Sequence, residues 1–135
     1  MTLDQQTTDR NPDSYENHIN GFNTQNNELF LSAFGDTAII IDGIAPSRWL
    51  NPNAPANWIA DSDKWRKDLG VSYENLSYEM GFWNVESSKA LRRHIGKFTV
   101  TIKGQTIVRT GTLAYTSSKH GDEWKIDAQA WGRTS

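Results

Sequence analysis

The second half of the chain is patterned for β-strands that are joined by short turns containing glycine. Apolar and β-branched residues recur over four segments, 76–83, 90–102, 105–116 and 124–131. Lys103-Gly104 separates the second segment from the third, and His120-Gly121-Asp122 precedes the fourth. Turns this short connect neighbouring antiparallel strands. The pattern therefore predicts an antiparallel sheet that follows chain order.

The residues before this sheet carry helical patterns. Tyr15, Ile19 and Phe22 recur at helical spacing and predict one helix. The polar residues after Phe22 break that helix, and Asn26 or Asn27 can cap a shorter second one. Two helices are therefore expected ahead of the first strand.

A short strand and a third helix are predicted between these two regions. Residues 38–41 form an apolar, mostly β-branched run that Asp42-Gly43 ends, which indicates a buried strand. The proline-containing segment that follows is expected to be an irregular loop. Pro55 fits the first turn of a helix, and Gly70 fits its C-terminal stop. Helices that precede a meandering sheet are typical of the α+β class.

The chain of 135 residues is long enough for one domain and too short for two of ordinary size. Residues 1–12 are polar and end in Asn11-Pro12. We expect them to form a disordered tail ahead of a single domain at 13–135.

Charge and hydropathy argue against several classes of partner. The net charge is −2, and the densest basic cluster, Arg92-Arg93-His94, ends at Ile95. A nucleic-acid interface needs a basic stripe that neutralises several phosphates, so no nucleic-acid partner is expected. No window approaches 18 apolar residues, and the N-terminus has no apolar stretch typical of a signal peptide. We expect a cytoplasmic protein that has no membrane partner.

The chain contains no cysteine, which excludes disulfides, thiolate metal sites and thiol catalysis. The three histidines, His18, His94 and His120, are widely spaced and match no zinc pattern. No glycine-rich phosphate loop occurs either. We therefore expect neither a metal nor another cofactor.

Several short motifs occur in an order that matches a known superfamily. They are Phe22-Asn23, Phe34-Gly35-Asp36-Thr37-Ala38, Asp42, the segment 45–54 followed by Trp58, and Gly121-Asp122-Glu123-Trp124-Lys125-Ile126. Over about residues 13–133 the chain resembles the nuclear transport factor 2-like superfamily, and most closely its SnoaL-like and ketosteroid-isomerase-like branch. The segment 45–54 is similar to a sub-branch whose members are mostly uncharacterised.

The resemblance implies a cone-shaped α+β fold, in which N-terminal helices pack on a strongly curved antiparallel sheet and enclose a pocket. It also implies a homodimer that forms through the sheets. Isomerases, dehydratases, epoxide hydrolases, polyketide cyclases, transport adaptors and non-catalytic subunits share this scaffold. The fold therefore does not decide the function.

Asp42 is the first candidate for catalysis. It follows an apolar strand, and burial there would raise the pKa of its carboxyl group and make it a usable base near neutral pH. The resemblance also places it where isomerase-like members carry their general base. The alternative is a turn residue whose carboxylate accepts backbone hydrogen bonds at the strand end.

Two histidines are candidate catalytic partners of Asp42. The resemblance places His18 where the isomerases carry a tyrosine that donates a hydrogen bond to an oxyanion, and a histidine can donate or shuttle a proton. His94 can pair with Asp42 across the pocket if it faces inward, and otherwise belongs to the surface or to a dimer interface. A bulge at Gly96 would reverse the alternation, so the face of His94 stays open. Either histidine can instead be a packed residue that has no chemical role.

The resemblance also implies groups that this sequence lacks. The isomerases need a protonated carboxylic acid on a central strand, and the epoxide hydrolases need a carboxylate–arginine–carboxylate set. Between Lys97 and His120 the chain has no Asp or Glu. The two strands of this hairpin therefore cannot supply the acid, which argues against both chemistries.

Other residues are candidates for ligand binding. Arg48 can clamp a carboxylate or a phosphate, and Trp49 beside it can cover the pocket. Alternatively, Trp49 fills the core and Arg48 pairs with an acid. Trp58 and Trp65 lie seven residues apart on one helix face, where they can pack in the core, line the pocket, or do both.

The last strand adds two more candidates for ligand binding. Asp127 and Trp131 share one face with Gln129 if the strand alternates regularly. Asp127 can instead pair with a lysine or arginine on the neighbouring strand.

Two functions fit these residues. The first is cofactor-independent acid/base chemistry of the cyclase, dehydratase or isomerase type on a hydrophobic small molecule with a polar or anionic group. In it Asp42 is the base, His18 or His94 is its partner, and Arg48 orients the ligand. The second is a non-catalytic ligand-binding or dimeric protein-interaction module.

Overall fold

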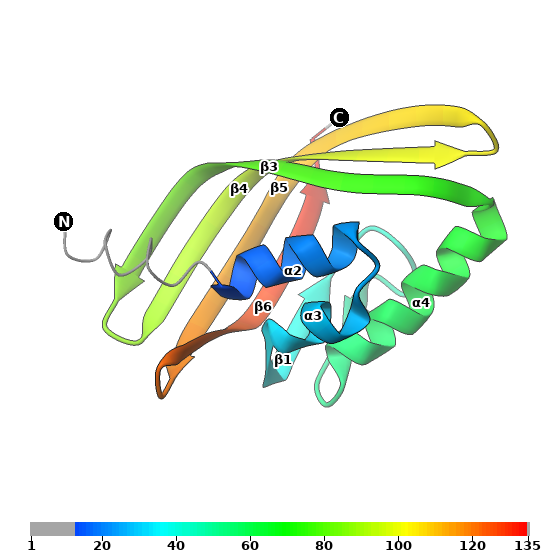
Figure 1. The fold of residues 1–135 in the computed structure, drawn as a ribbon. Coiled ribbons are helices and arrows are strands. Elements are labelled where there is room, and N and C mark those ends of the chain that lie inside the picture. Colours follow the sequence, from blue (N-terminus) through cyan, green and yellow to red (C-terminus); the bar gives the residue numbers. More distant parts are fainter. Residues whose placement is uncertain (1–12, 135) are drawn as a thin grey trace.

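The computed structural model describes residues 13–134. Two helices come first, then two strands, a longer helix and four long strands (Figure 1). They are α2 (Asp13–Asn23), α3 (Asn27–Ser32), β1 (Phe34–Ile41), β2 (Arg48–Trp49), α4 (Ala54–Leu69), β3 (Val71–Glu86), β4 (Lys89–Ile102), β5 (Gln105–His120) and β6 (Glu123–Arg133). The tail predicted at 1–12 lies outside the described residues.

All six strands form one open sheet in the order β2-β1-β6-β5-β4-β3. The four long strands are an antiparallel meander, as the turn pattern predicts. β1 pairs with β6 in the parallel direction, so the sheet is mixed and the expectation of a wholly antiparallel sheet is wrong for this pair. The reason is topological. α4 follows the short β1–β2 edge, the meander begins at the opposite edge with β3, and its last strand returns beside β1.

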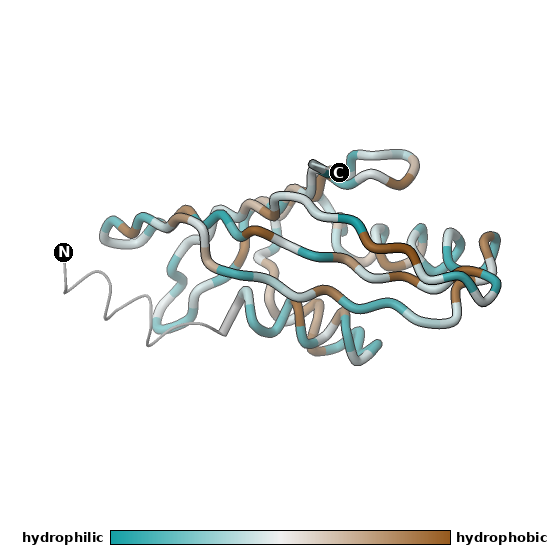
Figure 2. Tube along the Cα trace, turned by 90° about the horizontal axis from the view of Figure 1, so that it is seen from above, coloured by the Kyte–Doolittle hydropathy of each residue, from teal (hydrophilic) through white to brown (hydrophobic). Residues whose placement is uncertain are grey.

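Helices pack on one face of the strongly curved sheet, which confirms the predicted cone-like α+β fold. Figure 1 shows α2 and α3 under the concave side, with α4 beside them toward the β4–β5 turn. Seen from above, hydrophobic and hydrophilic positions are interspersed along the strands (Figure 2). This interspersion is expected when one face of each strand packs on a core.

The ends of the helices are set by capping residues close to them in the sequence. Asn26 caps α3, since its side chain accepts a hydrogen bond from the Leu29 N–H at 3.0 Å. Pro55 lies in the first turn of α4, and Gly70 ends this helix in a left-handed conformation, with φ 71°. The segment predicted as an irregular loop contains β2, which pairs with the end of β1.

The pairing of β4 with β5 keeps its register through Gly96, and the nearest irregularity lies in the neighbouring strand, between Met80 and Phe82 of β3. Gly96 and Gly111 are cross-strand partners, and the indole of Trp131 covers both. A Cβ atom at either glycine would lie 2.8 Å from the Trp131 ring. Only glycine therefore lets the ring rest directly on the sheet.

The core lies between the concave sheet face and the helices and is rich in aromatic rings. Phe30 stacks on Trp58 at 5.1 Å between centroids, and Phe34 lies 5.1 Å from Phe30. Such pairs contribute roughly 0.5–1.5 kcal/mol each beyond the burial of their area. The buried hydrophobic residues of this core cluster are Ile19, Phe30, Ala33, Phe34, Ala38, Ile40, Trp49, Ala54, Trp58, Leu76, Leu113, Tyr115 and Ile126.

Candidate functional site

A cavity of about 330 Å³ lies between the concave face of the sheet and helices α2 and α4. This volume is at the lower end of the range for small-molecule sites, roughly 300–1,000 Å³. Most of the wall is apolar or aromatic. The polar groups on the wall are His18, Asp42, Ser62, Arg66, Glu74, Arg109, Gln129 and Arg133.

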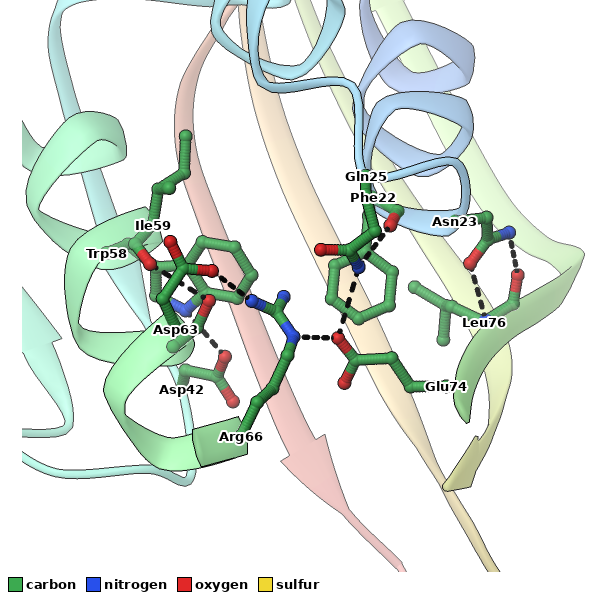
Figure 3. A network of polar contacts seen from close by, with 11 residues as sticks. Phe22, Asn23, Gln25, Asp42, Trp58, Ile59, Asp63, Arg66, Glu74 and Leu76 are labelled. Carbon is green, nitrogen blue, oxygen red and sulfur yellow. Dashed lines mark hydrogen bonds and ion pairs between the residues drawn. The ribbon is translucent and has the colours of Figure 1, made fainter. Parts of the chain in front are cut away.

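Asp42 enters the cavity directly after β1. Its Oδ2 accepts a hydrogen bond from Trp58 Nε1 at 2.8 Å (Figure 3). Its Oδ1 accepts one from the Gly43 N–H. Burial raises the pKa of the Asp42 carboxyl group, and the two hydrogen bonds offset part of that rise. The predicted effect of burial is confirmed, and the backbone bond of the alternative interpretation is present as well. The arrangement is a fixed carboxylate with an increased affinity for a proton.

His18 is buried on α2 and faces the same cavity. Its Nδ1 lies 2.9 Å from the hydroxyl oxygen of Tyr115. Burial, and then the neighbouring His94, lower the pKa of His18 to about 3, so the imidazole is neutral at pH 7. Burial also raises the pKa of Tyr115 well above its ordinary value, so the phenol keeps its proton.

The hydrogen bond to Tyr115 sets the tautomer of His18. A buried phenol proton without an acceptor would cost about 1–3 kcal/mol, and Nδ1 is the acceptor that the described residues offer. The phenol therefore donates to Nδ1, and the imidazole carries its own proton on Nε2. His18 thus presents a neutral N–H donor, the group that can stabilise a developing oxyanion.

His94 also points inward, with 0% of its surface exposed. It lies outside the cavity wall, among the rings of Tyr15, Tyr78 and Tyr115, at 5.3, 4.7 and 5.5 Å between centroids. Within the described part of the chain, neither ring nitrogen has a hydrogen-bond partner. Burial, together with Arg92, lowers its pKa to about 4. The structure therefore does not bring His94 together with Asp42 across the cavity.

Two residues of the proline-containing segment lie away from the cavity. Arg48 is exposed on β2. Trp49 is buried, and its Nε1 donates to Asp61 Oδ2 at 2.8 Å. Trp49 thus takes the core position of the alternative interpretation, and Arg48 does not reach a ligand in the cavity.

A register shift moves Asp127 away from the cavity. Ser117 pairs with Ile126 and Thr116 with Ala128, so Asp127 falls in a β-bulge. Its carboxylate accepts a hydrogen bond from Ser118 Oγ, which in turn accepts one from Lys89 Nζ at 2.7 Å. The expectation that Asp127 shares the face of Trp131 is wrong because the bulge interrupts the alternation.

Three predicted tryptophans do line the cavity. Trp58 and Trp65 come from α4, and Trp131 comes from β6. Trp58 also stacks on Phe30 in the core, so it has both of the roles foreseen for it. Gln129, two residues before Trp131, lines the wall as well.

Sequence reasoning missed an ion-pair network at the wall of the cavity. Arg66 on α4 pairs through Nε with Glu74 on β3, and its other nitrogen Nη1 lies 2.6 Å from Asp63 (Figure 3). The Glu74 side chain is only 5% exposed. This is a carboxylate–guanidinium–carboxylate set, supplied by α4 and β3 rather than by the hairpin where it was sought. The sequence contains one indication of this network: Arg66 directly follows Trp65, on the helix face that also bears Trp58.

Two more arginines line the cavity and were also missed. Arg109 lies on β5 and Arg133 near the end of β6. The signal was available, since Arg109 and Leu113 have the same parity on a strand without a bulge between them.

Other kinds of site find no support within residues 13–134. They contain no group of three or more His, Asp or Glu side chains that could hold a metal ion. None of their helices is long and apolar enough to cross a membrane.

Comparison with known proteins shows which solved structures have a similar fold. No protein-family model matches the chain, and no curated protein matches it. Solved structures do match over nearly its full length. Hexachlorocyclohexane dehydrochlorinase LinA-type3 from Novosphingobium barchaimii is 12% identical with a TM-score of 0.78, and covers 100% of this chain and 92% of its own.

Two further structures agree with this result. A ketosteroid isomerase-like protein from Erwinia carotovora is 12% identical with a TM-score of 0.73, over 90% of this chain and 92% of its own. A nuclear transport factor 2-like superfamily protein from Salmonella enterica is 15% identical with a TM-score of 0.72, over 99% and 92%. At these identities the likeness concerns the fold. The chain therefore has the nuclear transport factor 2-like fold.

Proposed function

We propose that the protein is an enzyme that catalyses cofactor-independent proton transfer on a hydrophobic small molecule, in a cyclisation, dehydration or isomerisation. The observation that supports this most is the pairing of two groups on one cavity wall. Asp42 is a carboxylate with a raised pKa, and His18 is a neutral hydrogen-bond donor. The similar structures include a dehydrochlorinase and a ketosteroid isomerase-like protein, which supports catalysis on this scaffold.

Each group has a defined part in the proposed step. Asp42 removes a proton from a carbon next to a carbonyl group, so the C–H bond breaks and the proton moves to the carboxylate. The electron pair shifts onto the carbonyl oxygen, and the Nε2–H of His18 donates a hydrogen bond to that oxyanion. The protonated Asp42 then returns the proton to another atom of the intermediate, which completes an isomerisation or assists the departure of hydroxide.

The surroundings of Asp42 suit a base that works in both directions. Trp58 and the Gly43 N–H hold the carboxylate in one orientation, since each donates to a different oxygen. Burial destabilises the ionised carboxylate, so the pKa of Asp42 rises toward neutral pH. The apolar wall keeps most water away from the intermediate.

Exchange of substrate hydrogen for solvent deuterium tests the proposal. The protein is incubated in deuterium oxide with a panel of hydrophobic ketones and hydroxy ketones, and incorporation is followed by mass spectrometry. We expect Asp42→Asn to lower the exchange rate by about 100-fold or more, because an amide cannot accept the proton. Asp36→Asn is the matched control, since Asp36 is exposed on β1. Equal rates for Asp42→Asn and the control would refute the proposal.

The outer face of the sheet supports the second candidate, a dimeric interaction module. It exposes several large apolar side chains on neighbouring strands, namely Tyr73, Phe82, Leu91, Ile95 and Val108. Exposed apolar patches mark interaction surfaces more often than isolated residues do. If the wild type binds ligands without any exchange and Asp42→Asn binds them equally, the module is the better account.

A further inference from the structure

Arg109 has no ionic partner among residues 13–134. It lines the cavity from β5 and is partly buried, opposite Phe98 on β4. Arg66 on the facing helix differs, because Glu74 and Asp63 both pair with it. The charge of Arg66 is thus compensated within the protein, whereas that of Arg109 faces the cavity without a counterion.

An uncompensated guanidinium in an apolar wall favours an anion from outside. Partial burial removes water from the charged group without supplying another partner. The planar fork of the guanidinium matches a carboxylate with two parallel hydrogen bonds. The guanidinium of Arg109 carries one positive charge, which the single negative charge of a carboxylate balances.

The strand register separates Arg109 from Asp42 along the cavity. Ile41 pairs with Ala130, so Asp42 follows at the level of Trp131, and Trp131 pairs with Leu113 on β5. Arg109 lies four residues before Leu113, about 13 Å along the strand. The carboxylate of Asp42 and the guanidinium of Arg109 therefore lie on one cavity wall, separated along the strand direction.

The surface between these two groups is the indole of Trp131. The ring rests on Gly96 and Gly111, where any Cβ atom would lie within 3 Å of it. It is thus a flat apolar platform at the level between Leu113 and Arg109. Phe98 and Leu113 complete the apolar wall on both sides of it.

We infer that the ligand is a hydrophobic carboxylate whose anionic end binds Arg109, whose flat apolar body lies on Trp131, and whose opposite end reaches Asp42. This inference rests on the proposed function for the identity of the reacting end, and names the substrate class of that site. The carboxylate is a recognition group and takes no part in the proton transfer.

Binding of a matched acid and amide tests the inference. Biphenyl-4-carboxylate is a rigid, elongated acid whose aromatic rings can lie on Trp131, and biphenyl-4-carboxamide has the same shape without the charge. Calorimetric titration is expected to give tighter binding of the acid to the wild type. Arg109→Gln should weaken binding of the acid by about 10- to 100-fold and leave binding of the amide unchanged. Arg109→Lys should restore part of the loss, because it keeps the charge but not the fork.

The controls separate this inference from the proposed function. Arg93→Gln removes a guanidinium on the exposed outer face of β4 and should change neither affinity. Equal binding of acid and amide by the wild type, binding of neither at millimolar concentration, or a parallel loss of both in Arg109→Gln would overturn the inference. Failure of the proposed function would appear in a different experiment, as a deuterium-exchange rate that Asp42→Asn leaves unchanged.

Discussion

Replacing Tyr115 by phenylalanine tests the assigned tautomer of His18, because it removes one oxygen atom from a buried pair. The hydroxyl oxygen lies 2.9 Å from His18 Nδ1, and both side chains are buried. Phenylalanine keeps the ring and its edge-on contact with the imidazole, at 5.4 Å between centroids. The variant therefore separates the hydrogen bond from the packing.

The size of the effect follows from the buried acceptor that remains. Without the phenol, Nδ1 of His18 has no partner in an interior that excludes water, at a cost of about 1–3 kcal/mol. We expect the free energy of unfolding of Tyr115→Phe to fall by this amount in urea denaturation at pH 7. Tyr73→Phe is the matched control, because Tyr73 is exposed, and should change stability by less than about 0.5 kcal/mol.

The same variant has a spectroscopic signature. Nitrogen chemical shifts of labelled His18 report which ring nitrogen carries the proton. We expect the wild type to have the proton on Nε2, and Tyr115→Phe to have a mixture of tautomers, since nothing then holds Nδ1 as an acceptor. A wild-type proton on Nδ1, or a Tyr115→Phe variant as stable as the wild type, would refute the reasoning.

Three further predictions follow from the same structure. Lowered pKa values of about 3 for His18 and about 4 for His94, against 6.5 in the unfolded chain, mean that unfolding takes up protons below pH 6.5. The free energy of unfolding should therefore fall by about 1.4 kcal/mol per pH unit for each histidine from about pH 6 toward pH 4. The raised pKa of Asp42 acts in the opposite direction, because the folded state then binds up to one proton more at this carboxyl group. Equal midpoints of urea denaturation at pH 7 and pH 5 would contradict the prediction. Trp58→Phe removes a hydrogen bond that lowers the pKa of Asp42, so the acidic limb of the pH–rate profile should move to higher pH, and an unmoved limb would count against Asp42 as the base. Ile95 is 59% exposed on the outer face of the sheet, so a charge there should disrupt a sheet-mediated dimer. We expect light scattering to show a dimeric wild type and a monomeric Ile95→Glu variant, and a monomeric wild type would exclude this dimer.

Local sequence patterns were sufficient to predict most of the elements. The spacing of Tyr15, Ile19 and Phe22 marks α2, and Gly70 ends α4 through its left-handed conformation. These signals involve residues within a few positions of one another, so the sequence alone carries them. The place of Asp42 at the end of an apolar strand was visible for the same reason.

The features that sequence reasoning missed depend on contacts between distant segments. The parallel pairing of β1 with β6 joins residues about 90 positions apart, and no local pattern encodes it. The bulge at Asp127 is a property of the pairing between β5 and β6, so alternation along one strand misplaced this residue.

The arginines of the cavity show the same limit. Arg66 and Glu74 are close in sequence, but their pairing depends on how α4 turns into β3 at Gly70. Arg48, the arginine chosen from its loop, lies on the exposed β2 edge instead. The residue type marks arginines as candidates for ligand binding, whereas the direction of each side chain depends on the fold.

Carbon NMR of the Asp42 carboxyl group tests the central claim most directly, because the claim is that this group is a partly buried base facing the cavity. The protein is labelled at the side-chain carboxyl carbons of aspartate, Asp42→Asn identifies the resonance, and its shift is followed against pH. The account predicts a pKa above the ordinary value of 3.8 that changes when biphenyl-4-carboxylate binds. A pKa at or below 3.8 that is insensitive to the ligand would contradict it.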